Sequence, residues 1–583
     1  MLLFWGLIGF LQTIFLPGAA ICVIFIKYRL GFSRFITLSF IYSLASNYII
    51  LYILLYFNIY TKFSMIIVFI IFITILVYYF FNKNKTIKIN INYSFKDDIN
   101  LNTYHITNIK NIFISLISLT TLLVILFYHK YVYTHIDAIN SWDVWAVSWA
   151  SNTYPSTYGD YPQLAAMIMS IPYVYMGTTK IQIFSILTSQ FCVIPCLFGL
   201  YCLRKSKYMY SAVTAAVGLV WLFAASKGIA PDITVIIFCL LSYVMLQLHI
   251  IEYSNGNQDK LYLYSAFIAA AISGTLKQTG LIWVFLFIFV SIYQLAEIGI
   301  NRKKIYKTIF LPAIISLIFS LSWYIFNTYL IYIGLVPTKI VSIFDNPAYY
   351  KGRSFLQRAI YCFFHYSYYS VFILPTIRCL FIKRYFPISI SSLIFMSGWI
   401  FFLSYNSANG KLPVALACIP LGYCIEELLN NLKLLNFISY IYFKIFNFFK
   451  IGLSNFLIFL TSILLLILSV SLIFSDKINT FLQLSTDNKF LTTGEIGLTR
   501  RVDYLEKRNP QKILTCDGRL VQLASIPNNY YKICSNTENI LDFGYIVLSN
   551  DFINTINYYD LNKYFVLDYQ ERQFSLYIKK TLL

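Results

Sequence analysis

The sequence predicts an all-α polytopic membrane protein of about 14 transmembrane helices, followed by a small C-terminal α/β extracytoplasmic domain. Of its 583 residues, 59% are hydrophobic and only 12% are charged, and the mean hydropathy is +0.68. A soluble globule of this size needs more polar surface than that. Apolar runs of about 20 residues, long enough to cross a bilayer, recur along most of the chain.

Hydropathy places each expected helix in order along the chain, with short polar loops between neighbours. The predicted spans lie near residues 3–26, 36–57, 63–81, 110–128, 181–203, 208–224, 231–252, 260–276, 279–298, 306–333, 357–377, 386–405, 412–427 and 452–475.

Basic residues cluster in the short loops between these spans. The net charge of +21 would suggest nucleic-acid binding in a soluble domain, but loops of a membrane protein explain it without a nucleic-acid partner. Cytoplasmic loops are rich in Lys and Arg. An N-terminus outside the cytoplasm then puts the polar segment 82–110 inside, and it also puts inside the basic loops Lys27–Arg34, Arg204–Lys207, Asn301–Lys304 and Lys383–Tyr385.

Three parts follow from this pattern. Residues 1–109 form an N-terminal extension of three spans with a cytoplasmic loop. Residues 110–475 form the transmembrane core, with an acidic outer loop at 129–180. Residues 476–583 form the outer domain, where short apolar runs such as "KILTC", "YIVLS" and "YFVLDY" indicate strands. Cys516 and Cys534 lie in this part, and an oxidising compartment permits a disulfide between them that their spacing alone does not establish.

The acidic outer loop differs from the rest of the chain. From Thr134 to Met167 it reads "THIDAINSWDVWAVSWASNTYPSTYGDYPQLAAM". An ordinary outer loop with tryptophans at the headgroup level would explain its indoles, but not the order of its elements. An acid follows a span, then come a Trp/Ala segment, a Pro-containing loop and a short apolar stretch that ends at Gly177. The acids are Asp137, Asp143 and Asp160.

This order resembles that of the C-type (GT-C) membrane glycosyltransferases, the superfamily of protein O-mannosyltransferases and lipid A aminoarabinose transferases. The matching elements in the loop are Asp137, "WA" at Trp145, "YPQL" from Tyr161, and Gly177. Downstream, "KGIAPDITVIIF" and "SGTLKQTGLIWVF" resemble an outer-loop acid and a Lys-Gln motif of the family, which places Asp232, Lys277 and Gln278. The resemblance extends over roughly residues 110–307.

The chain departs from the family pattern in three ways. Three spans precede the one that carries the acidic motif, and Pro162-Gln163 stands where the family has two prolines. The family's Asp-Glu pair is absent, because Asp137 is followed by Ala138. Either Asp137 or Asp143 therefore fits the role of the functional acid, and Asp137 matches better by position.

The resemblance implies an enzyme of the bacterial inner (plasma) membrane that transfers a sugar on its outer face. The implied donor is a sugar on a polyprenyl phosphate, and the acceptor is a glycan, a lipid or a protein. A carboxylate can take the proton of the attacking hydroxyl, contributing roughly 10²–10⁴-fold, and fixed cations can stabilise the departing phosphate. We expect no metal or other cofactor, and the five histidines lack zinc-ligand spacing. The expected substrate-binding residues are Trp142, Trp145, Asp160, Tyr161, Gln163, Asp232, Lys277, Gln278, Arg353 and Arg358.

Simpler explanations exist for several of these residues. Lys277 fits a snorkelling side chain at the end of a span, and Asp232 fits a helix cap after Pro231. Arg353 and Arg358 fit contacts with lipid headgroups, and Asp160 fits a turn.

Two other classes of function remain open on the sequence. A transporter or flippase for polysaccharides or lipid-linked glycans has a similar number of spans, although the chain shows no convincing internal repeat. An O-antigen ligase or polymerase would share the donor chemistry. Such an enzyme is expected to carry a large loop among its later spans, and the loop at 334–356 is modest.

Overall fold

The protein is described from a computed structural model. The structure describes residues 1–25, 30–81, 112–121, 123, 142–155, 161–179, 181–226, 231–333, 354–365, 369, 371–403, 410–431, 512–515, 531–533, 540–549, 561, 563–571 and 574–582. The predicted span at 452–475, both ends of the span at 110–128, and both Cys516 and Cys534 lie outside these residues.

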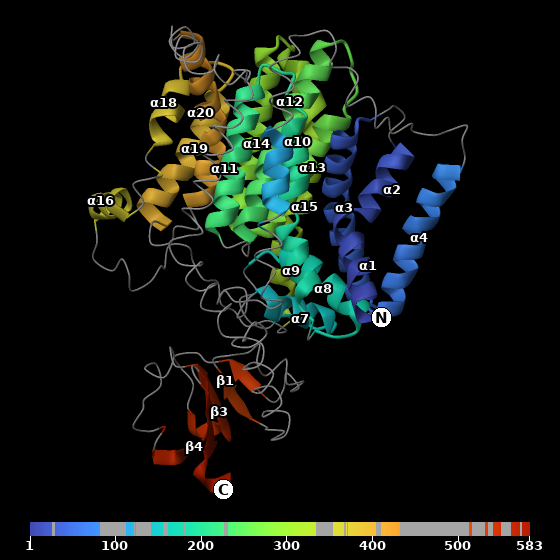
Figure 1. Cartoon of the computed structure of the whole chain (residues 1–583), viewed down its shortest axis with the longest axis vertical. Helices are drawn as coiled ribbons and strands as arrows, with labels where there is room; N and C mark the ends of the chain where they lie inside the picture. The colour runs from blue at the N-terminus through green and yellow to red at the C-terminus, as the bar shows by residue number, and fades with distance from the viewer. Residues whose placement is uncertain are drawn as a thin grey trace, which may run out of the picture.

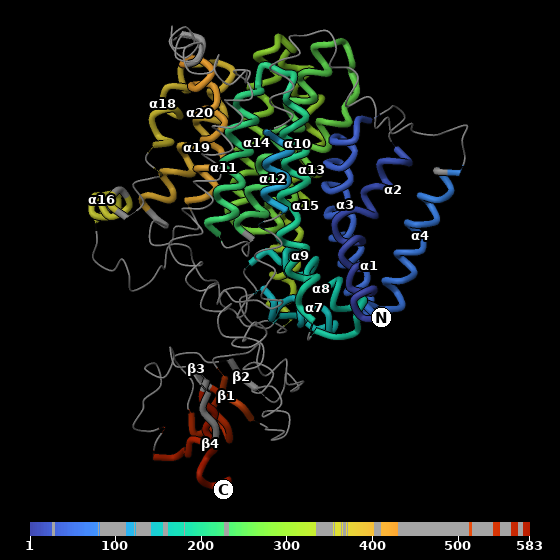
Figure 2. Tube along the Cα trace, in the orientation of Figure 1, coloured from blue at the N-terminus to red at the C-terminus, as the bar shows by residue number. Residues whose placement is uncertain are grey.

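Helices account for nearly all of the described N-terminal three quarters of the chain (Figure 1). They are α1 Leu2–Ile14, α2 Leu16–Phe25, α3 Phe32–Tyr56, α4 Lys62–Phe81, α7 Val144–Ala150, α8 Leu164–Met176, α9 Ile183–Gln190, α10 Val193–Tyr201, α11 Met209–Ala225, α12 Pro231–Ser254, α13 Leu261–Leu276, α14 Gln278–Glu297, α15 Arg302–Tyr332, α16 Phe355–His365, α18 Ile373–Cys379, α19 Phe386–Gly398 and α20 Lys411–Asn431. Figure 2 follows the chain from α1–α4 on one side, through a central group, to α18–α20 on the other.

The apolar helices confirm the predicted class of helical membrane protein. Among the described residues, six helical segments are long and apolar enough to cross a membrane, and the bent pair α1–α2 makes a seventh. The six coincide with the predicted spans at 36–57, 63–81, 181–203, 231–252, 279–298 and 306–333. Nearly all of α4 lies on the surface although it is strongly apolar. An exposed apolar helix is unfavourable in water but suits contact with lipid.

The first span is broken rather than straight. Helices α1 and α2 meet at Phe15 with a bend of 43°. Pro17 has no N–H to donate to the Thr13 carbonyl. The Asn47 side chain of α3 donates instead to the carbonyls of Gln12 and Thr13, each at 3.0 Å. In a membrane such freed carbonyls must find protein partners, so α3 stabilises the break.

One predicted span is divided differently in the structure. Residues 357–377 are predicted to form a single span, but the described residues up to 365 lie in α16 and those from 373 lie in α18, with a turn at residues 371–372. Ser354 and Gln357 form a reciprocal capping pair at the start of α16, since each backbone N–H donates to the other's side chain. Leu356, Ile360 and Phe364 recur at helical spacing on the exposed side of α16. The mean hydropathy over residues 357–377 predicts a single span because it does not distinguish this short amphipathic helix from a transmembrane one.

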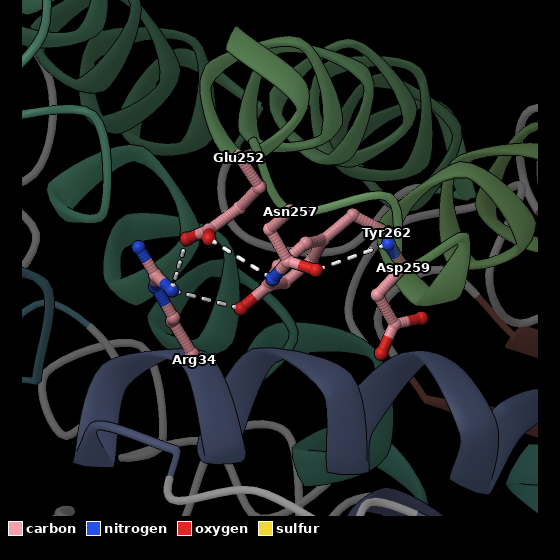
Figure 3. A network of polar contacts seen from close by, with 5 residues as sticks. All are labelled: Arg34, Glu252, Asn257, Asp259 and Tyr262. Atoms are coloured by element: carbon pink, nitrogen blue, oxygen red, sulfur yellow. Dashed lines mark hydrogen bonds and ion pairs between the residues drawn. The ribbon is translucent and has the colours of Figure 1, made fainter. Parts of the chain in front are cut away.

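A polar network joins three helices at the end of the bundle that carries the basic loops (Figure 3). Arg34, near the start of α3, donates to the Glu252 carboxylate at 2.8 Å and to the Tyr262 hydroxyl at 3.0 Å. Asn257 donates to the second Glu252 oxygen at 3.3 Å, and the Asp259 side chain accepts from the Leu261 N–H at the start of α13. These contacts hold the α12–α13 hairpin against α3.

The described C-terminal residues form a five-stranded mixed sheet with the order β2-β1-β3-β5-β4. Its central strands run parallel for β1 and β3 and antiparallel for β3 and β5. The three quoted strand-like runs coincide with β1, β3 and β4, which confirms the sheet expected from their alternation. The strands are β1 Ile513–Thr515, β2 Tyr531–Ile533, β3 Tyr545–Ser549, β4 Phe565–Glu571 and β5 Phe574–Lys579.

Candidate functional site

The described part of the acidic outer loop folds into two short helices, α7 and α8. The predicted apolar stretch is α8, which ends at Gly177 in the left-handed conformation, with φ of 68°. Glycine adopts this conformation without the steric cost that a side chain imposes. Asp137 and Asp160 lie outside the described residues, so their roles remain predictions.

Asp143 lies immediately before α7 and its side chain is fully buried. The Tyr173 hydroxyl of α8 donates to one carboxylate oxygen at 2.5 Å. The Gln182 amide, just before α9, donates to the other oxygen at 3.0 Å. A buried carboxylate requires such donors. Asp143 therefore ties together α7, α8 and α9, which the sequence did not predict.

The tryptophans of this loop pack against protein. The Trp142 and Trp145 rings are 4.8 Å apart between centroids in an edge-to-face arrangement, and Tyr161 contacts both rings. Trp149 donates to the Gln163 side chain at 3.1 Å. All three indoles are buried, so the alternative of an ordinary loop with headgroup-level tryptophans does not describe them.

A second group of predicted residues meets at the start of α12. Asp232 lies in its first turn, and Lys277 stands in an extended conformation between α13 and α14. The Lys277 ammonium forms an ion pair with the Asp232 carboxylate. The resemblance placed both residues in the site but did not predict this pairing. Gln278 follows Lys277 in the chain as the first residue of α14 and is half-buried.

Lys411 is a further charged residue of this group that the sequence analysis missed. It is the first residue of α20 and only 9% exposed. Its ammonium lies within electrostatic range of both Asp232 and Lys277. The available signal was its position in "NGKLPV", directly before an apolar run on the outer side of the predicted topology.

The Asp143 cluster and the Asp232–Lys277 pair lie at the same end of the bundle. Arg34 contacts Glu252 near the end of α12, and Asp232, 20 residues earlier on that helix, is therefore roughly 30 Å away. Arg34 is also within electrostatic range of Cys202, which follows α10. Gln182, at the far end of the α9–α10 span, therefore lies away from the basic loops together with Asp143.

The remaining predicted cations are placed only in part. Arg358 in α16 donates to the Phe401 carbonyl at 3.1 Å, which connects α16 to the π-helical turn Trp399–Leu403 after α19. Arg353 lies outside the described residues. A role of either arginine at a lipid phosphate remains a prediction.

No family model, no curated protein and no solved structure matches this chain.

The Tyr173 hydroxyl is expected to stabilise the fold by holding Asp143. Tyr173→Phe should lower the free energy of unfolding by about 1.5–3 kcal/mol, because a buried carboxylate loses a donor. The measurement is the melting temperature in detergent. Tyr154→Phe is the matched control, since Tyr154 contacts the Trp149 ring and no hydrogen bond to its hydroxyl is found within the described ranges. Equal melting of the two variants would contradict the holding role.

Proposed function

We propose that the protein is a membrane glycosyltransferase that moves a sugar from a polyprenyl-phosphate donor to an acceptor at the outer face of the bacterial inner membrane. In this proposal the chain has about 14 spans, its GT-C-like core spans residues 110–475, and residues 476–583 lie outside the cytoplasm.

The supporting observation is that a carboxylate, Asp143, and a lysine, Lys277, lie at the same end of the bundle. Asp143 holds α7, α8 and α9 together, and the Asp232–Lys277 pair lies at the same end. Transfer needs a carboxylate base at the acceptor hydroxyl and cations at the lipid phosphate. The end with the basic loops carries the Arg34 network instead.

The test is a transfer assay with purified protein in vesicles. Synthetic polyprenyl-phosphate hexoses with a labelled sugar serve as donors, and an envelope extract supplies acceptors. We expect label to leave the lipid fraction and appear in acceptor. If every donor kept its sugar–phosphate bond, this result would contradict the proposed transferase activity.

A second candidate is a transporter of lipid-linked glycans. The observation that favours it is the broken span α1–α2, which contacts the span formed by α9 and α10 through Phe10 and Phe191. Transporters place substrate sites at discontinuous helices. Gln190, at the end of α9, is buried, and its amide has no hydrogen-bond partner among the described residues. The same vesicles distinguish the two, because a transporter would move labelled donor across the bilayer unchanged.

The proposed sidedness has its own test. Ser151, after α7, and Asn255, after α12, are both exposed and lie at opposite ends of the bundle. A membrane-impermeant maleimide should label Ser151→Cys in intact cells and label Asn255→Cys only after lysis. The proposed sidedness places the basic loops in the cytoplasm, because cytoplasmic loops are rich in Lys and Arg. Labelling in the reverse order would contradict it.

A further inference from the structure

Two cysteine thiols face one another between α18 and α20, which lie side by side (Figure 1). The sulfur atoms of Cys379 and Cys424 are 3.8 Å apart. Both cysteines follow a proline by four residues, in "PTIRC" and "PLGYC". The Cys379 thiol donates to the Pro420 carbonyl at 3.5 Å, and the Cys424 thiol donates to the Pro375 carbonyl at 3.8 Å. These reciprocal contacts place both thiols between the two helices, where each can reach the other.

A disulfide between these thiols requires little movement. The two sulfur atoms of a disulfide are about 2.0 Å apart, so the thiols have to approach one another by roughly 1.8 Å. Rotation of a cysteine side chain about its Cα–Cβ bond can supply such a movement. Pro420 lies inside α20 and has no N–H for the helical hydrogen bonds, so the helix can bend one turn before Cys424.

The cysteine pair lies at the end of the bundle that carries the basic loops. Tyr423 comes directly before Cys424, and its ring is 4.9 Å from the Tyr385 ring between centroids. The Arg384 guanidinium lies 5.8 Å from the centroid of the Tyr423 ring. Arg384 and Tyr385 belong to a loop that the charge pattern predicts to be cytoplasmic. Because the cytoplasm keeps thiols reduced, a disulfide at this place would form only when an oxidant is present.

We infer that Cys379 and Cys424 form a redox-sensitive pair, which a hydroperoxide converts reversibly into a disulfide joining α18 to α20. The inference is independent of the proposed function. Cys424 is half-buried and Cys379 is fully buried, so the oxidant reaches Cys424 first.

The chemistry balances with hydrogen peroxide as the oxidant. The Cys424 thiolate attacks one peroxide oxygen and the O–O bond breaks, which gives a sulfenic acid and the first water. The Cys379 sulfur then attacks the Cys424 sulfur and displaces the second water. Two thiols and one hydrogen peroxide thereby give one disulfide and two waters. A dithiol reductant restores both thiols by exchange.

The disulfide changes how firmly α18 is held against α20. Arg378 and Glu427 join the same two helices through an ion pair at 2.9 Å, but this pair is partly exposed and such pairs contribute little. Because Arg378 is engaged by Glu427, it does not activate a thiol as a lone cation would. We therefore expect the disulfide to form over minutes to hours and to raise the melting temperature.

The test treats the purified protein with hydrogen peroxide, alkylates the remaining thiols and identifies linked peptides by mass spectrometry. We expect a Cys379–Cys424 peptide that is lighter by two hydrogen atoms than its two free peptides together and that dithiothreitol separates. Cys424→Ser should abolish this peptide. Cys202→Ser is the matched control and should keep it, because Cys202 is also half-buried and lies near Arg34 at the same end of the bundle.

The melting temperature provides a second readout. Hydrogen peroxide should raise it in the parent protein and in Cys202→Ser, and should leave it unchanged in Cys424→Ser. Cys424→Ala repeats the comparison, so that an unstable serine variant does not decide the outcome. Oxidation of other cysteines without a link between Cys379 and Cys424 would overturn the inference. A link already present in cells grown without added peroxide and trapped with a permeant maleimide would overturn the redox-sensitive part, because the bond would then be a permanent one.

Discussion

Asp137→Asn is expected to lower the rate of sugar transfer by roughly 10²–10⁴-fold while the protein remains folded. An amide cannot accept the proton of the acceptor hydroxyl, so the attacking oxygen would keep its proton in the transition state. The measurement is label transfer from a polyprenyl-phosphate hexose at saturating donor. A melting curve of the same preparation shows whether the fold is preserved.

Asp143→Asn separates the two candidate acids. Both Asp143 oxygens accept hydrogen bonds in a buried setting, and an amide can replace only one of these acceptors. We expect this variant to lose stability as well as activity, whereas Asp137→Asn should lose activity alone. Should Asp137→Asn keep its rate while a stable Asp143→Asn loses it, Asp143 is the base. Full transfer rates in both variants would contradict the mechanism.

Gly280→Ala is expected to disrupt the junction that presents Lys277. A Cβ at this position would lie 1.9 Å from the Ser273 carbonyl oxygen and 2.3 Å from its carbon. Both atoms are backbone, so α13 and α14 must separate to admit a methyl group. Overpacking of this kind costs about 1–3 kcal/mol or more. We expect a clearly lower melting temperature and weaker donor binding, because Lys277 would move away from Asp232.

Gly398→Ala is the matched control for this variant. Gly398 also lies in a helix, α19, and a Cβ there would meet nothing within 4 Å. Alanine favours helix over glycine by roughly 0.8–1.0 kcal/mol, so this substitution should leave the melting temperature equal or higher. A Gly280→Ala protein that melts like Gly398→Ala would show that the α13–α14 contact is looser than described.

Much of the architecture follows from local patterns in the sequence. The spans at 36–57 and 231–252 are long apolar runs, and α3 and α12 lie where those runs predict. The strands β1 and β3 lie in short apolar runs of the polar tail. Hydropathy failed at residues 357–377, because the amphipathic helix α16 and the short α18 have the average composition of one span. A window average hides which side of a helix is polar.

The candidate site depends on contacts that no local pattern contains. The sequence singled out Asp143, Asp232 and Lys277 by the order of their motifs. It could not show that Asp143 is buried against Tyr173, 30 residues away, or that Lys277 pairs with Asp232, 45 residues away. It missed Lys411 altogether.

The sequence by itself determined the membrane class, most of the helices and the strands of the tail, because burial in lipid and strand alternation are periodic along the chain. Only the tertiary structure decided the partners of the charged residues. The antiparallel packing of α11 and α20 brings Lys411 to the start of α12. A buried charge is stable only with the groups that packing places around it.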